Sequence, residues 1–141
     1  MNQTRFARLG KPWLCLAAAL FAQGCAPQGG WNGIYTVDLV GGAKTCVAPA
    51  ATPPDGQNVL VQMQVSNEGG WCGAPVTHAG VPFDSYLLVT RPNHGHVFAH
   101  RVGGSTRIDY TPDAGFTGTD SFAVRLIPGN AVFQGAVTVT R

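Results

Sequence analysis

The stretch Tyr110-Thr-Pro-Asp-Ala-Gly-Phe-Thr-Gly-Thr-Asp-Ser-Phe122 predicts the end of one strand, a glycine-rich corner and the start of a second strand. Pro112 cannot donate a hydrogen bond to a neighbouring strand and so ends the first one, while Phe116 gives the corner an apolar side chain. From Phe122 to Leu126 large apolar side chains recur at every second position, the pattern of a strand with one buried face. The corner indicates a β-sandwich and contains no catalytic motif.

The rest of the chain is divided into short segments of the same kind. Apolar side chains alternate through 58–66, with Leu60 as the exception, and the Gly103-Gly104 dipeptide suits a tight hairpin turn. Segment 85–90 is typical of a buried strand, and 67–83 of a long irregular loop. We expect strands at 34–40, 58–66, 85–90, 94–102, 105–110, 120–127 and 132–140. The sequence thus predicts an all-β sandwich of about seven strands.

Residues 1–24 have the composition of a secretory signal peptide. Three basic residues and no acidic one precede a ten-residue apolar run at 13–22, which is too short to span a bilayer as a helix. We therefore divide the 141-residue chain into a signal peptide (1–24), a short tether that begins with Cys25 (25–30) and one sandwich domain (31–141).

Cys25 follows the apolar run directly after a small residue, Gly24. This arrangement resembles the lipobox of bacterial lipoproteins, in which the chain is cut before the cysteine and the new N-terminus is acylated. Ala22 and Gln23 stand where that family usually has Leu and then Ala, Ser or Thr. The resemblance implies lipidation of Cys25 and a protein anchored to a membrane of the bacterial cell envelope, facing the periplasm or the outside. Ordinary cleavage at the same place is the alternative, and it leaves a soluble periplasmic or secreted protein.

The remaining cysteines form a pair. Of the four in the chain, Cys15 lies in the leader and Cys25 is the acylation candidate, which leaves Cys46 and Cys72. In an oxidising compartment these two should form a disulfide, worth about 3 to 4 kcal/mol of stability. A metal site is the competing interpretation, but two cysteines without C-x-x-C partners do not make one.

Charge and motifs narrow the classes of function. Without the leader the formal net charge falls from +2 to −1, because six basic residues then face seven acidic ones. The basic residues are scattered singly, which excludes the basic stripe that nucleic acid binding needs. The chain contains no nucleophile motif, no His-Glu-x-x-His and no phosphate-binding loop. We therefore expect neither an enzyme nor a cofactor.

Three segments in the C-terminal half carry a family resemblance. The run at 92–97, the Tyr110-Thr-Pro112 strand end and the Gly115-to-Phe122 corner resemble the bacterial Ig-like, cadherin-like domains of surface proteins. The resemblance covers about residues 85–141 and leaves the half with the two paired cysteines uncovered. It implies an Ig-like β-sandwich used for adhesion, spacing or protein contact.

The histidines are the most informative polar group. His94, His96 and His100 fall on one face of an expected strand, with Phe98 between the last two. Alternate strand residues point the same way, so His94 and His96 are candidate ligands for zinc or copper. His94 and His100 would lie about 20 Å apart on an extended strand, too far to bind the same ion. In the family pattern Val97 points inward. His96, Phe98 and His100 would then form a solvent-exposed aromatic row, which is a candidate contact patch. Burial of Phe98 under a neighbouring loop is the other alternative.

Trp71 is the second candidate for contact. Its indole, beside Cys72, would either cover the disulfide as part of the core or lie exposed as a ligand contact. The leading prediction is a non-enzymatic envelope lipoprotein acting as a structural or protein-interaction module, with an unknown envelope or surface protein as partner. The alternative is a periplasmic small-ligand or metal-binding protein that uses His94, His96 and the Trp71 loop.

Overall fold

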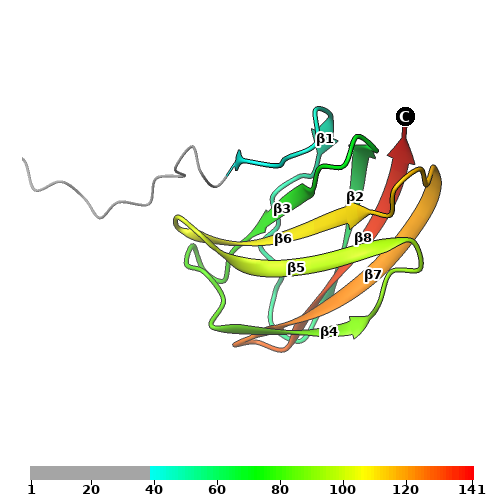
Figure 1. Ribbon diagram of the computed structural model, residues 1–141. Coiled ribbons are helices and arrows are strands. Elements are labelled where there is room, and N and C mark those ends of the chain that lie inside the picture. Colours follow the sequence, from blue (N-terminus) through cyan, green and yellow to red (C-terminus); the bar gives the residue numbers. More distant parts are fainter. Residues whose placement is uncertain (1–38) are drawn as a thin grey trace, which may run out of the picture.

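The structure, a computed structural model, describes residues 39–141, which form eight strands in two packed sheets (Figure 1). The strands are β1 (Cys46–Val47), β2 (Asn58–Ser66), β3 (Cys72–Val76), β4 (Ser85–Thr90), β5 (Gly95–Val102), β6 (Ser105–Pro112), β7 (Gly118–Ile127) and β8 (Ala131–Thr140). The all-β sandwich with one disulfide is confirmed. No helix among residues 39–141 has the length and hydropathy that crossing a bilayer requires.

The larger sheet has five strands in the order β1-β2-β8-β7-β4. β8 lies at its centre, parallel to β2 and antiparallel to β7. Gly135 on β8 is directly opposite Phe122 on β7, and a Cβ at Gly135 would collide with the Phe122 ring. The absence of a side chain at this position lets the aromatic ring lie flat against the neighbouring strand.

The smaller sheet has three strands in the order β3-β6-β5. β5 and β6 form the predicted hairpin around Gly103-Gly104, and Gly103 has the positive φ angle, 56°, that such a turn requires. Between the two sheets, the rings of Tyr110, Phe122 and Phe133 stack in series with centroid separations of 5.9 Å. This aromatic column fills the centre of the core.

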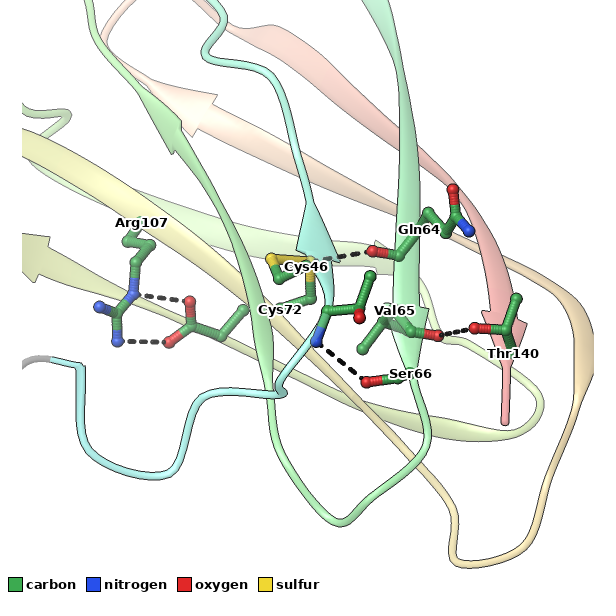
Figure 2. Close-up of a disulfide and its surroundings, with 9 residues drawn as sticks. Cys46, Gln64, Val65, Ser66, Cys72, Arg107 and Thr140 are labelled. Atoms are coloured by element: carbon green, nitrogen blue, oxygen red, sulfur yellow. Dashed lines mark hydrogen bonds and ion pairs between the residues drawn. A yellow bond between two sulfur atoms is a disulfide. The ribbon is translucent and has the colours of Figure 1, made fainter.

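The disulfide joins the two sheets at one end of the sandwich. Cys46 on β1 belongs to the larger sheet and Cys72 on β3 to the smaller one, with Cα atoms 5.1 Å apart (Figure 2). Nearby, the amide of Thr45 donates to the hydroxyl of Ser66 at 3.1 Å, which fixes the approach of β1 to β2. The predicted Cys46–Cys72 pair is thus present, and it connects the edge strands of the two sheets, one of which, β1, is only two residues long.

Two of the eight strands were not predicted. β1 is only two residues long, and β3 lies inside 67–83, which was expected to be an irregular loop. In β3 the alternate residues Cys72, Ala74 and Val76 are buried, but the Gly and Pro between them hide this pattern in the sequence. The expected first strand at 34–40 lies mostly outside the described residues, and Leu39-Val40 form no strand.

The predicted burial of β4 is wrong. β4 is the last strand of the larger sheet, and of its side chains only Leu88 is partly buried against the core. The run Ser85-Tyr-Leu-Leu-Val-Thr90 looked like a strand covered on both faces, whereas it is an exposed edge.

The corner that follows β6 is held by Asp120 at the start of β7. Its carboxylate accepts hydrogen bonds from the amides of Asn93, His94 and Ser121 at 2.8 to 2.9 Å, and the Tyr110 hydroxyl donates to it at 3.0 Å. Burial acts to raise the pKa of Asp120, but these hydrogen bonds outweigh it and hold the pKa below its ordinary value. The pKa of Tyr110 is raised, mainly by burial and to a smaller extent by the Asp120 carboxylate. The corner is a structural device, as the sequence indicated.

Candidate functional site

The predicted contact residues lie on the outer face of the three-stranded sheet. Strand pairing places Phe98 opposite Asp109, which lies opposite Gly73, and His100 opposite Arg107, which lies opposite Pro75. These residues therefore form two rows across the same face. We call this surface the Phe98 face and define it by Trp71, His96, Phe98, His100, Arg107 and Asp109.

The β5 side chains alternate as expected. Ala99 is buried and Val97 packs against the core, so the side chains between them point outward. Phe98 is 63% exposed, which shows that no neighbouring loop of the described residues covers it. His100 leans against Phe98 with ring centroids 4.7 Å apart, and its side chain is only 28% exposed. His96 and Phe98 are therefore exposed on this face, whereas His100 is mostly covered.

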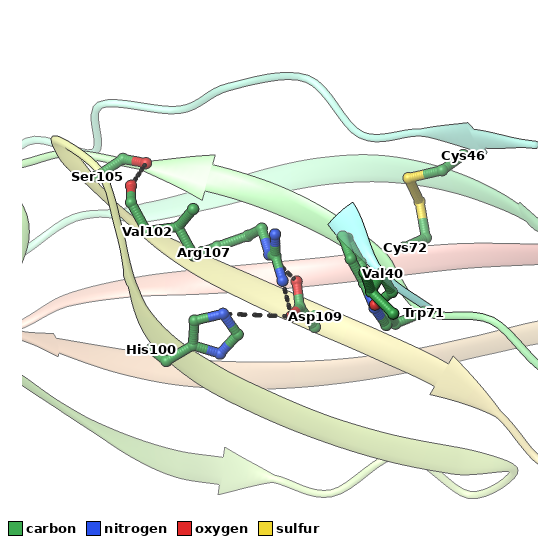
Figure 3. A network of polar contacts seen from close by, with 9 residues as sticks. All are labelled: Val40, Cys46, Trp71, Cys72, His100, Val102, Ser105, Arg107 and Asp109. Atoms are coloured by element: carbon green, nitrogen blue, oxygen red, sulfur yellow. Dashed lines mark hydrogen bonds and ion pairs between the residues drawn. A yellow bond between two sulfur atoms is a disulfide. The ribbon is translucent and has the colours of Figure 1, made fainter. Parts of the chain in front are cut away.

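A nearly buried ion pair lies at the centre of the Phe98 face (Figure 3). Arg107 donates from Nε to Oδ1 of Asp109 at 2.7 Å and from Nη2 to Oδ2 at 3.0 Å. Nε2 of His100 lies 3.7 Å from the same carboxylate. A Cβ at Gly73 would overlap Oδ1 of Asp109, so the glycine makes room for the pair. Two-point pairing satisfies both charges and fixes the orientation of both side chains.

Trp71 packs against the arginine of the ion pair. The guanidinium carbon of Arg107 lies 3.8 Å from the centroid of the indole ring, a cation–π contact. The indole Nε1 donates to the carbonyl oxygen of Val40 at 3.1 Å. Trp71 is half-buried and so is not a core residue, and part of its ring contacts Arg107. Its role as a ligand contact stays a prediction.

A groove of about 400 Å³ runs beside Trp71. Its walls are mainly apolar and come from the segment before β1, from β3 and from the end of the β5–β6 hairpin: Leu39, Gly42, Ala43, Cys46, Trp71, Gly73, Pro75, Val102, Ser105 and Arg107. The groove continues the Phe98 face toward the β3 edge, because Trp71 and Arg107 belong to both.

The three histidines have different surroundings. β5 begins at Gly95, and His94 lies before it, where its ring stacks on Phe116 at a centroid distance of 4.2 Å. His96 is directed to a different group, with Nδ1 3.6 Å from Oδ1 of Asp113. Among residues 39–141 no three His, Cys, Asp or Glu side chains lie close enough to hold a metal ion. His94 and His96 as a pair of metal ligands stay a prediction, and their rings contact different residues, Phe116 and Asp113.

Sequence reasoning missed the residues that organise the face. Arg107 and Asp109 are two positions apart on one strand and so share a face, a spacing visible in the sequence. His78 was missed as well: its Nε2 lies 2.8 Å from Oδ1 of Asp55, on a different part of the surface. Nothing in the local sequence links positions 55 and 78. Cys25, the predicted lipidation site, lies outside the described residues.

Comparison with known proteins does not assign the chain to a family. No protein family model matches the chain, and no curated protein matches it. The solved structures that match include the crystal structure of the cysteine protease inhibitor EhICP2 from Entamoeba histolytica, which is 10% identical and covers 65% of this chain and 96% of that chain at a TM-score of 0.31. Because so low a score supports no conclusion, the site rests on the geometry of this chain.

Proposed function

We propose that the chain is a non-enzymatic protein-interaction module whose working surface is the Phe98 face. The observation that carries this proposal is a large aromatic side chain, Phe98, left 63% exposed on a strand whose neighbours are fixed by a paired Arg107 and Asp109. Aromatic residues presented on a rigid surface are typical of the centres of protein interfaces, where a few of them supply most of the binding energy.

The ion pair supports this role in two ways. It neutralises both charges within the chain, so a partner covering the face need not supply an opposite charge. It also fixes Arg107 and, through it, the ring of Trp71, which lowers the entropy cost of ordering side chains on binding. The adjacent groove offers space for an apolar side chain of the partner.

The position of His100 lowers the stability of the fold. Its Nδ1 atom is buried without a hydrogen-bond partner among the described residues. An unsatisfied buried polar atom costs about 1 to 3 kcal/mol, and such positions in natural proteins are often functional. Its contacts with Phe98 and Asp109 support a role in shaping the face.

We do not assign a reaction to this surface. Arg107 occupies both oxygens of Asp109, and the hydroxyl of Ser105 donates to the carbonyl oxygen of Val102 at 3.2 Å rather than to His100. An activated nucleophile needs a base within hydrogen-bond reach, and no such pairing is present among these side chains.

Site-specific photo-cross-linking tests the proposal. A benzoylphenylalanine placed at Phe98 should give one discrete adduct in the native envelope, identifiable by mass spectrometry. The matched control is the same group at Thr138, which is exposed on the outer face of the larger sheet. Adducts that are absent at Phe98, or identical at both positions, would contradict the proposal.

Membrane anchoring through Cys25 belongs to the same proposal and rests on the leader sequence alone. If Cys25 is acylated, Cys25→Ser should move the protein from the membrane to the soluble fraction and reduce its mass by that of the acyl groups. A Cys25→Ser protein that stays membrane-bound with unchanged processing would rule out lipidation at this position.

The groove favours a second candidate function, binding of a small apolar ligand. A volume of about 400 Å³ with mainly apolar walls is of the size that small-molecule sites have. Binding of the dye 1-anilinonaphthalene-8-sulfonate that is lost in Trp71→Ala but retained in Phe98→Ser would support it. Equal binding in all three proteins would remove this candidate.

A further inference from the structure

β4 presents an unusual edge. It ends the five-stranded sheet, carries no charged residue, and exposes Tyr86, Leu87 and Val89 by 42%, 56% and 49%. Natural proteins generally protect such edges with charges, prolines or covering segments, because unpaired backbone groups on an apolar strand pair readily with another strand. Among the described residues nothing extends the sheet beyond β4.

Charges flank this edge in a self-complementary way. Asp84 precedes β4 and Arg91 follows it, and both are exposed. The Asp84 side chain is 75% exposed. Its Oδ1 accepts a hydrogen bond from Nη2 of Arg101 at 3.1 Å, so a basic group of a second copy would add to an ion pair within the chain and would not be its first partner. If two β4 strands pair in antiparallel orientation, the acidic end of each one meets the basic end of the other. The charge pattern therefore favours a second copy of this chain over a strand of unrelated sequence.

The faces of β4 are compatible with such a pairing. Leu87 lies opposite Arg125 on the outer face of the sheet, and Tyr86 and Leu88 lie opposite Leu126 and Val124 on the inner face. A twofold axis perpendicular to the sheet keeps outer residues beside outer residues. With the axis at Leu87, that residue meets its own copy, and Tyr86 meets Leu88 of the second copy.

We infer that the chain forms a twofold homodimer by antiparallel pairing of β4 edges, which joins two five-stranded sheets into one continuous sheet of ten strands. The register irregularity between Leu88 and Thr90 shortens the regular part of the edge, so the dimer depends on a few apolar contacts and the two end charges. This inference concerns the larger sheet and is independent of the Phe98 face.

Sedimentation velocity of the full chain tests the inference. The unchanged protein should dimerise reversibly, and Leu87→Lys should weaken the dimer by at least about tenfold, because two ammonium groups then meet at the axis. Val47→Lys is the matched control, since Val47 is 55% exposed on β1 at the opposite edge of the same sheet. A monomer at every concentration up to the solubility limit, or a dimer disrupted only by Val47→Lys, would overturn the inference.

Charge exchange tests the antiparallel arrangement. Asp84→Arg alone and Arg91→Asp alone each place like charges at both ends of the pair and should each weaken the dimer about tenfold. The double variant Asp84→Arg/Arg91→Asp restores opposite charges and should recover dimerisation. Failure of the double variant to recover, while its circular dichroism spectrum and thermal midpoint match the unchanged protein, would contradict the inference.

A cross-link gives a readout that does not depend on disruption. In a chain with Cys15→Ser and Cys25→Ser, an added Leu87→Cys should form an intermolecular disulfide on mild oxidation, because directly opposed strand residues lie within disulfide distance. Thr138→Cys in the same background should form no intermolecular disulfide, because position 138 lies on β8, away from the paired edges. Equal cross-linking at both positions would overturn the inference, since it would indicate random collision.

Discussion

At the scale of single residues, substitutions of an exposed and of a buried phenylalanine should have different effects on the free energy of unfolding. Phe98 is 63% exposed, whereas Phe122 is almost fully buried in the aromatic column. Phe98→Ser should therefore change the free energy of unfolding by less than about 0.5 kcal/mol, while Phe122→Ala should cost about 3 to 5 kcal/mol. Guanidinium denaturation of the two variants measures the difference. A large loss of stability in Phe98→Ser would mean that Phe98 is a packing residue and not a contact residue.

Asp120 sets a pH dependence of stability. Because hydrogen bonds hold its folded-state pKa below the ordinary value, its ionised form stabilises the fold above that ordinary value. This contribution is lost as the pH falls through the folded-state pKa. Asp120→Asn should cost about 2 kcal/mol at neutral pH and progressively less below about pH 4.

Urea denaturation of Asp120→Asn at several pH values checks this. Asp113→Asn is the matched control, because Asp113 is a half-exposed carboxylate of the same corner and should change the free energy by less than about 0.5 kcal/mol. A cost of Asp120→Asn that is constant down to acid pH would show that the charge of the carboxylate does not matter.

Gly73 tests the seating of the ion pair. A methyl group at this position would overlap Oδ1 of Asp109 and approach the Arg107 side chain at 2.8 Å. We expect Gly73→Ala to destabilise the fold by about 1 to 3 kcal/mol and to displace Arg107 from the face of Trp71, which changes the indole fluorescence. A Gly73→Ala protein with unchanged stability and fluorescence would show that the Arg107–Asp109 pair does not need a glycine at position 73.

At the scale of elements, the disulfide holds two short edge strands. β1 and β3 belong to different sheets, and the cysteines that join them are 26 residues apart. The variant Cys46→Ser/Cys72→Ser should lose about 3 kcal/mol of stability, because the unfolded chain regains the entropy of a loop of this length. Thermal unfolding with and without reductant provides the control: reductant should lower the midpoint of the unchanged protein and leave that of the variant where it is.

The sequence predicted the long strands and their inward faces but not the edges. β2 and β8 have a clear alternation of apolar residues, and the Gly103-Gly104 turn fixes the β5–β6 hairpin. β3 was not predicted because Gly73 and Pro75 stand between its buried residues and hide the alternation. The burial of β4 was misjudged because its apolar run resembles a central strand. Burial of an edge strand depends on its position in the sheet, which no local pattern encodes.

The candidate site was predicted in part for the same reason. The outward row of His96, Phe98 and His100 follows from alternation along one strand. The contacts of that row with Arg107, Asp109 and Trp71 depend on the pairing of three strands and on a cation–π contact across the β3 edge. Such contacts between distant segments cannot be derived from the pattern of one segment.

At the scale of the whole molecule, the fold closes through β2 and β8. These strands, at opposite ends of the described chain, pair in parallel over nine residue pairs, from Asn58–Val132 to Ser66–Thr140. Pairing between segments so far apart in the sequence makes unfolding cooperative and folding slow, since the whole loop must be closed before the pairing stabilises it. The edge strands β4 and β1 contribute little to this closure, because each one pairs on a single side.

Native-state hydrogen exchange should therefore be graded across the sheet. We expect the slowest exchange in β8 and β2 at the centre, which open only on global unfolding, and the fastest in β4, whose outer amides face solvent. Mass spectrometry of peptic peptides from Leu87→Lys at low protein concentration, where the weakened dimer dissociates, measures this gradient in the monomer. The unchanged protein at high concentration should show added protection in β4 alone among the strands that the structure describes. Equal protection of β4 and β8 in the monomeric variant would mean that the edge is covered by a segment of the same chain, and the apolar run of β4 would then need no second copy.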